Sequence, residues 1–262
     1  MKNYLPFWLI IFVSFVIIFA LSAFDEISIG SYKPKSSGMY DNLTRQRSIS
    51  DDMPDEEKAI SDSTAVAQQP VPVDTASKVI LFIGDSMLDG LSPRLAAYAE
   101  QNGHTLYTVI WYSSTSERWG KSDKLASYIK RIKPGYIFLC LGANELSVKD
   151  IIAKRDAYVK KIISDIGDIP YVWIGPPNWK EDTGINRLIA TNAATGCYFK
   201  SDGMTFERGK DGAHPTRSSA AEWMDSVARW MPLHCSHPIK MELPESDFGR
   251  PARVYVHQPD EN

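Results

Sequence analysis

Residues 79–87 read VILFIGDSM, an apolar run that ends in a glycine and is followed at once by Asp85 and Ser86. A short run of this kind, almost entirely apolar, is typical of a strand buried on both faces of a parallel sheet. The next residues, 91–101, carry apolar side chains at helical spacing, and Pro93 suits a first turn. The stretch therefore predicts a buried strand, a tight turn and a helix.

The same order of strand and helix recurs along the chain. Further apolar runs predict strands at 106–112, 136–142, 171–175 and, shorter, 197–201. Helical spacing predicts helices at 121–132, 147–166, 186–194 and 217–230. Regular alternation of this kind predicts an α/β domain with a parallel, doubly wound sheet of about five strands. Ligands bind beyond the carboxyl ends of the strands in such sheets, so polar residues there are candidate site residues.

Three polar clusters follow predicted strands, at 84–86, 142–145 and 211–214. A serine hydroxyl attacks an ester only when a base takes its proton, and a third group must orient that base. We expect Ser86 to be the nucleophile, His214 the base and Asp211 the orienting carboxylate. The Asn144 amide and backbone N–H groups near Ser86 are candidates for an oxyanion hole.

The three clusters also resemble a known family. GDSM (84–87), GANE (142–145) and DGAHP (211–215) are similar, in order and separation, to the first, third and fifth blocks of the SGNH, or GDSL-like, hydrolase superfamily. The resemblance covers residues 78–233. It implies a three-layer α/β/α fold like that of flavodoxin and ester chemistry through an acyl-enzyme without a metal or cofactor. It also assigns Ser86 as an oxyanion donor, Asn144 as the oxyanion amide, and Asp211 with His214 as the rest of the triad.

The second block of the family departs from its usual form in this chain. A glycine whose N–H helps to bind the oxyanion is expected after the second strand, where this sequence reads YSSTSERWG (112–120). Ser113, Ser114, Ser116 or Gly120 are the alternatives for this donor, and we favour Ser114. Glu145 stands where the third block often has aspartate, and we expect a structural role for it.

The segment WIGPPNW (173–179) gives a hint about the substrate. Its Gly-Pro-Pro turn is similar to that of a bacterial envelope branch of the superfamily, which includes the DUF459-type proteins. Asn178 and Trp179 are candidate substrate-binding residues, since an indole can stack on a sugar ring. A packing role for Trp179 in a rigid loop is an equal alternative.

Composition narrows the classes of partner. The net charge is −3 and no long basic run is present, so nucleic acid is an unexpected partner. The cysteines lack the spacing of a metal site, and HCSH (234–237) resembles a metal fragment but has too few further ligands nearby for a tetrahedral site. Three cysteines are too few for a disulfide scaffold, although Cys197 and Cys235 could pair in an oxidising compartment. We expect a monomer that needs no cofactor.

The N-terminal quarter of the chain differs from the rest. Residues 5–24 are uncharged and long enough to span a bilayer as a helix, so residues 1–24 are predicted to be a transmembrane anchor, with a cleaved signal segment as the alternative. Residues 25–77 are polar and predict a flexible linker. The domain is then expected at 78–235, followed by an extended tail at 236–262. The resemblance places this domain outside the cytoplasm, in the periplasm, on a single-pass membrane protein.

These observations favour a serine esterase that removes O-acyl groups, acetyl above all, from a carbohydrate or cell-envelope polysaccharide. An O-acyltransferase with the same triad is the first alternative, because water and a sugar hydroxyl compete for one acyl-enzyme. A glycan-binding module that keeps an inactive triad is the second alternative.

Overall fold

The computed structural model describes residues 71–260. The predicted anchor at residues 1–24 and nearly all of the predicted linker lie outside this range. Among residues 71–260, no helix has both the length and the apolar composition that a membrane span requires.

A parallel sheet forms the centre of the domain. Its six strands are β1 Val79–Gly84, β2 Thr105–Trp111, β3 Tyr136–Cys140, β4 Tyr171–Ile174, β5 Tyr198–Phe199 and β6 Arg253–His257. They lie in the order β5-β4-β3-β1-β2-β6, and all neighbours pair in parallel. The order from β2 to β5 is that of flavodoxin, so the predicted α/β fold is confirmed.

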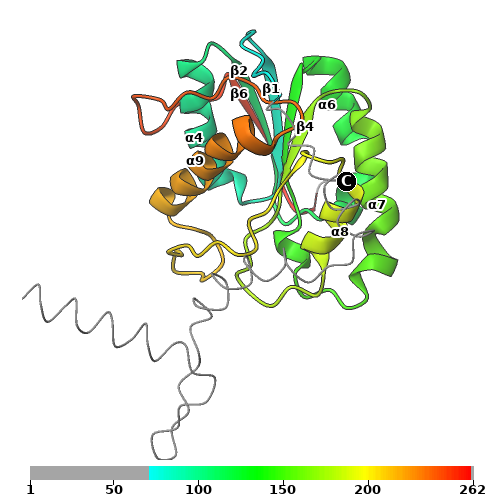
Figure 1. Ribbon diagram of the computed structural model, residues 1–262. Coiled ribbons are helices and arrows are strands. Elements are labelled where there is room, and N and C mark those ends of the chain that lie inside the picture. The colour runs from blue at the N-terminus through cyan, green and yellow to red at the C-terminus, as the bar shows by residue number, and fades with distance from the viewer. Residues whose placement is uncertain (1–70, 261–262) are drawn as a thin grey trace, which may run out of the picture. The chain divides into compact units, whose positions relative to one another are not determined.

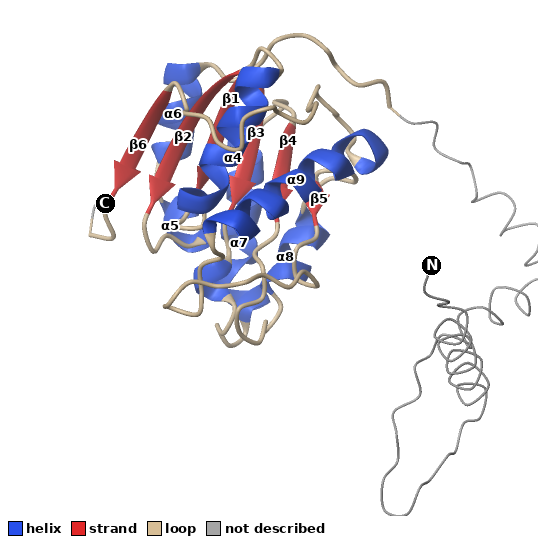
Figure 2. Cartoon of the chain, turned by 90° about the vertical axis from the view of Figure 1, so that its left-hand side faces the viewer, coloured by secondary structure: helices blue, strands red, loops and turns tan. Residues whose placement is uncertain are grey.

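Helices cover both faces of this sheet (Figure 1). They are α4 Leu88–Gln101, α5 Ser116–Lys121, α6 Lys124–Ile132, α7 Ile151–Ile166, α8 Ile185–Asn192 and α9 Arg217–His234, with a 3-10 turn at Ala143–Glu145. Helices α4 and α9 pack on one face, which is turned toward the viewer in Figure 2, and α5 to α8 pack on the other. The domain is therefore the predicted three-layer α/β/α sandwich.

Alternation along the central strand explains why both faces are apolar. Ile80 and Phe82 face the core shared with α4 and α9, whereas Leu81 and Ile83 face the core shared with α5 to α8. All four side chains are fully buried. A strand that buries alternate residues on two sides must read as a continuous apolar run, which is the pattern of residues 79–84.

Gly84 fixes the end of β1 next to β3 and α4. A Cβ atom at this position would lie 2.3 Å from the carbonyl oxygen of Cys140 and 2.3 Å from the Leu88 side chain. Only glycine permits the backbones to approach this closely. The close approach brings the turn at 84–87 directly over the carboxyl ends of β1 and β3, where the strand order reverses.

The expected tail at 236–262 is wrong as far as the structure describes it. Residues 236–252 run along the domain beside α4, and Arg253–His257 adds the sixth strand, β6, next to β2 (Figure 1). The tail was predicted because residues 236–262 are largely polar. Within them, β6 is an edge strand in which three of five residues are exposed. Such a strand needs no continuous apolar run.

The start of the domain also differs from the expected residue 78. The backbone N–H of Asp74 donates to Pro238, and its carbonyl accepts from Lys240, so residues near 74 pair with the C-terminal segment. The domain therefore begins a few residues before residue 78, where the chain is joined to the segment at 238–240.

Candidate active site

Ser86 occupies the turn between β1 and α4. The carbonyl of Asp85 accepts from Leu88 N–H at 3.2 Å and that of Ser86 accepts from Asp89 N–H at 3.2 Å, which starts the helix immediately after the serine. The side chain of Ser86 is partly exposed and borders a hollow of about 670 Å³. The turn therefore presents the hydroxyl to solvent beyond the carboxyl end of the sheet.

The structure brings the three predicted triad residues together. His214 Nε2 lies 2.7 Å from Ser86 Oγ, and His214 Nδ1 lies 2.7 Å from Asp211 Oδ2. With an ionised Asp211, Nδ1 must carry the ring proton and Nε2 is left to accept the serine proton. Ser86 and His214 are 128 residues apart in the chain, so this contact depends on the whole sheet.

Asp211 is held as an anion by its own loop. Its Oδ1 accepts from the N–H groups of His214 at 3.0 Å and Ala213 at 2.9 Å, while Oδ2 faces the imidazole. These backbone bonds, with the His214 contact, lower the pKa of Asp211 to about 2. The carboxylate therefore stays ionised at any pH at which a histidine base can work. Its side chain is 54% exposed, so water shares in stabilising the charge.

Asn144, the predicted oxyanion amide, lies in the turn after β3. Its Nδ2 donates to the Ser114 carbonyl at 3.0 Å and has a longer contact of 3.4 Å with Asp85 Oδ2. The first bond fixes the direction of the amide. The second is long enough to be exchanged for a stronger bond to a developing oxyanion.

The favoured second-block donor, Ser114, is wrong. Its N–H already donates to the Trp111 carbonyl at 3.1 Å, and its side chain is fully buried. Ser114 instead positions two neighbours, because its carbonyl accepts from Asn144 and its Oγ accepts from Trp119 Nε1. The sequence could not show this, since the partners come from distant segments.

Of the four alternatives, Ser113 fits the donor role. Ser116 N–H donates to Glu145, and Gly120 lies within α5 against Tyr158. Ser113 borders the same hollow as Ser86, and its φ of 54° is the left-handed conformation that glycine usually takes. Its N–H has no partner among residues 71–260, and the same is true of Ser86 N–H. These two N–H groups and the Asn144 amide make the candidate oxyanion hole.

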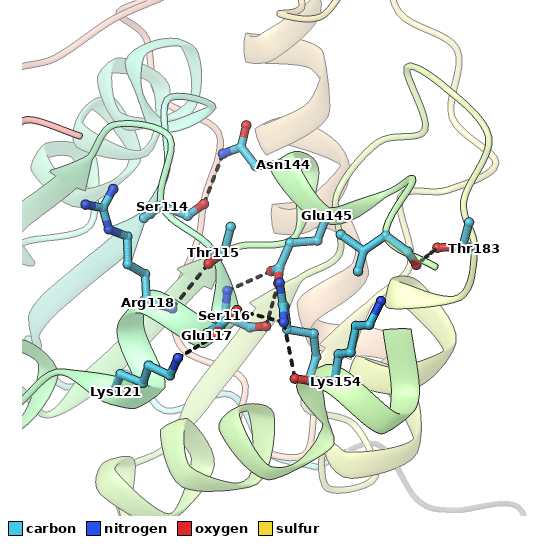
Figure 3. A network of polar contacts seen from close by, with 12 residues as sticks. Ser114, Thr115, Ser116, Glu117, Arg118, Lys121, Asn144, Glu145, Lys154 and Thr183 are labelled. Carbon is cyan, nitrogen blue, oxygen red and sulfur yellow. Dashed lines mark hydrogen bonds and ion pairs between the residues drawn. The ribbon is translucent and has the colours of Figure 1, made fainter. Parts of the chain in front are cut away.

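Glu145 has the structural role expected of it (Figure 3). Its buried carboxylate accepts from Ser116 N–H at 2.7 Å and Ser116 Oγ at 2.9 Å, and it pairs with Arg155 Nε at 2.7 Å. Arg155 also pairs with Glu117 at 2.7 Å. This network ties α5 to α7 and fixes the loop that carries Ser113 and Ser114.

Asp85, beside the nucleophile, is fully buried and structural. Its Oδ1 accepts from Met87 N–H at 3.0 Å, which shapes the turn around Ser86. Burial raises the pKa of Asp85 to about 7, against the opposing effects of the Met87 N–H and of His214. The neighbouring Glu145 carboxylate adds to the rise.

This pKa gives a stability that depends on pH. The unfolded carboxyl titrates near 3.8, so between about pH 4 and pH 7 the folded state binds more protons and the free energy of unfolding falls as pH rises. Asp85→Asn removes this titration. We expect the free energy of unfolding of the variant, relative to wild type, to rise by on the order of 4 kcal/mol from pH 4 to pH 7. Urea unfolding across this range measures it, and a constant difference would show that Asp85 titrates normally.

The hollow beside the triad also contains residues that the sequence analysis missed. Asp89, Tyr112 and Arg217 border it together with Ser86 and His214. The Tyr112 hydroxyl donates to Asp89 Oδ1 at 3.1 Å, and burial raises the pKa of Asp89. Arg217 is the first residue of α9, three residues after His214, and that proximity was the available signal in the sequence.

The two predicted substrate residues do not border this hollow. Trp179 Nε1 donates to the Ala143 carbonyl at 3.1 Å, and the indole packs against both apolar cores. Asn178 Oδ1 accepts from Asn186 at 3.0 Å. Trp179 therefore has the packing contacts of the alternative, with its N–H bonded within the protein and its ring partly buried.

The three cysteines are buried free thiols in this structure. Burial raises the pKa of each, and Cys197 Sγ lies 3.3 Å from the Ser236 hydroxyl. The considered pair of Cys197 and Cys235 is not bonded here.

Comparison with known proteins gives similarity in structure alone. No family model and no curated protein matches the chain. The chain is similar to the esterase EstA of a Pseudoalteromonas species, with 18% identity and a TM-score of 0.43 over 58% of this chain and 97% of that one. It is also similar to a Desulfitobacterium hafniense protein assigned to the lipolytic G-D-S-L family, with 14% identity and a TM-score of 0.40 over 57% of this chain and 97% of that one.

Proposed function

We propose that this protein is a serine esterase that cleaves O-acyl esters through an acyl-enzyme on Ser86. The observation that carries the proposal is the continuous chain of contacts from Ser86 Oγ to His214 Nε2 and from His214 Nδ1 to Asp211, each 2.7 Å long. Such a chain activates a hydroxyl for attack on a carbonyl carbon. Its position at the switch point of the sheet, open to a hollow, leaves room for a substrate.

The first half of the reaction makes an ester on the enzyme. Ser86 Oγ attacks the carbonyl carbon while His214 Nε2 takes the hydroxyl proton. The negative charge that moves to the carbonyl oxygen is bound by the N–H groups of Ser86 and Ser113 and by Asn144 Nδ2. When the intermediate collapses, the bond to the alcohol breaks and His214 returns the proton to the departing alcohol oxygen.

The second half regenerates the serine. Water gives a proton to His214 and attacks the acyl carbon, the oxyanion forms again in the same place, and the carboxylic acid leaves as Ser86 recovers its proton. Asp211 remains ionised throughout and stabilises the imidazolium that forms twice.

The proposed substrate is an acetylated carbohydrate. A hollow of about 670 Å³ bordered by Asp89, Tyr112 and Arg217 offers polar partners for sugar hydroxyl groups, beside the apolar side chains of Met87 and Pro215. If residues 1–24 tether the domain outside the cytoplasm, as we also propose, an envelope polysaccharide would be within reach.

The activity is tested by incubating the purified full chain with p-nitrophenyl acetate and with an acetylated xylo-oligosaccharide, and by measuring p-nitrophenol and free acetate. We expect release of both. The acyltransferase alternative predicts acetyl transfer to an added unacetylated oligosaccharide, detected by mass. The binding-module alternative predicts no release from either ester.

A further inference from the structure

We propose that the catalytic hollow is one end of a longer groove that crosses Arg217 and Phe248 and binds the chain of a neutral oligosaccharide. The proposal rests on the esterase function proposed above and names the part of the substrate that lies beyond the ester. Phe248 belongs to the C-terminal segment that the sequence presented as a tail.

Three hollows meet at Arg217. The first, of about 670 Å³, contains Ser86 and His214. The second, of about 410 Å³, and the third, of about 820 Å³, both border Phe248 as well as Arg217. The first and the third also share Pro93. An extended ligand whose ester reaches Ser86 would therefore pass along Arg217 to Phe248.

Buried contacts hold the segment of Phe248 in place. Arg94, only 6% exposed, pairs with Asp225 through Nε at 2.7 Å and Nη2 at 3.2 Å. Its Nη1 donates to the carbonyls of Ser246 at 3.0 Å and Asp247 at 2.9 Å. A bidentate pair with both carbonyls satisfied is rigid, so the backbone next to Phe248 is fixed to α4 and α9.

Gly249 completes this attachment on the other side of Phe248. Its N–H donates to the Pro93 carbonyl at 2.8 Å. A Cβ atom at Gly249 would lie 2.7 Å from backbone atoms of Ala96 and Ala97, so a larger residue would push the segment away from α4. The ring between these two anchors is only partly buried, and the Arg217 guanidinium lies 3.9 Å from its centroid.

The lining of the groove indicates the class of ligand. Side chains of both charges border the second and third hollows, with Glu222 and Asp247 opposite in sign to Arg217 and Arg250. An alkyl chain would remove water from these groups without replacing its hydrogen bonds. A polyanion would meet the carboxylates. A neutral sugar chain offers both donors and acceptors, and its apolar ring face suits an aromatic side chain.

Binding and catalysis can be measured separately. Calorimetry of the Ser86→Ala chain with xylohexaose, cellohexaose and chitohexaose measures binding without turnover. We expect at least one hexamer to bind, Phe248→Ala to weaken it about tenfold, and Phe248→Trp to restore it. In the active chain, kcat/KM of Phe248→Ala for the acetylated form of that hexamer should fall about tenfold more than kcat/KM for p-nitrophenyl acetate, chiefly through KM.

Leu243→Ala is the matched control, since Leu243 is 67% exposed in the same C-terminal segment and lies in none of the three hollows. It should change neither measurement. The proposal is overturned if no hexamer binds at millimolar concentration, or if Phe248→Ala affects both esters equally. Loss of the esterase function alone would look different, because hexamer binding would persist in a chain that hydrolyses neither ester.

Discussion

Replacing Ser86 with alanine is expected to lower kcat for p-nitrophenyl acetate by about 10⁴- to 10⁶-fold. The hydroxyl is the only group lost, and its oxygen lies 2.7 Å from Nε2 of the base, His214. Without it, His214 can at most activate water, and the oxyanion donors act on a weaker nucleophile. The backbone of the turn is held by Asp85 and by the helix bonds that follow, so we expect the fold to remain.

Ser226→Ala is a suitable control because it makes the same chemical change on α9, where the hydroxyl donates to the Glu222 carbonyl and accepts from Arg229, both in exposed contacts. Its kcat should stay within about twofold of wild type. Unfolding curves of both variants should match wild type to within about 1 kcal/mol. Residual activity above about 1% in Ser86→Ala would mean that another group is the nucleophile.

Asp211→Asn is expected to have the second largest effect, a fall in kcat of about 10³-fold. An asparagine amide can donate to His214 Nδ1, which places the ring proton on Nε2 and leaves that nitrogen unable to accept the serine proton. The fall should be smaller than the roughly 10⁴-fold of buried triads, because the Asp211 side chain is 54% exposed and water can partly replace it.

Asp211→Asn should change the tautomer of His214 and leave the shape of the loop unchanged. Asparagine keeps an oxygen that can accept from the N–H groups of Ala213 and His214, so the loop should retain its shape. Wild type should show no second loss of activity from Asp211 above about pH 3, because the pKa of that carboxyl is about 2. If Asp211→Asn retained more than about a tenth of wild-type kcat, His214 would be oriented by another group.

Local patterns were sufficient for the first five strands of the sheet and for the triad. The central strands are buried on both faces, and such strands must be apolar throughout, so residues 79–84 and 136–140 were readable directly. The triad followed because Asp211 and His214 are close in sequence and because parallel strands place their carboxyl ends together. The turns that follow the parallel strands therefore all lie at the same edge of the sheet, which brings their polar residues together.

The parts that could not be predicted depend on contacts between distant segments. Ser113 and Ser114 are adjacent polar residues of the same type, and only the bond from Ser114 N–H to Trp111 and the left-handed φ of Ser113 separate their roles. Strand β6 is short, lies in a largely polar segment and leaves Val254 and Val256 exposed, so its place in the sheet depends on its pairing with β2. Phe248 has no local signal at all, since its position is fixed by Arg94, 154 residues earlier in the chain.

The most direct test of the account is covalent trapping of the nucleophile. The full chain is incubated with a p-nitrophenyl alkylphosphonate at neutral pH, and the modified residue is located by intact mass and peptide mapping. We predict one adduct per chain, on Ser86, formed in step with loss of esterase activity, and none in Ser86→Ala. An adduct on another residue, or full activity in a chain labelled at Ser86, would contradict the assignment of Ser86 as the nucleophile.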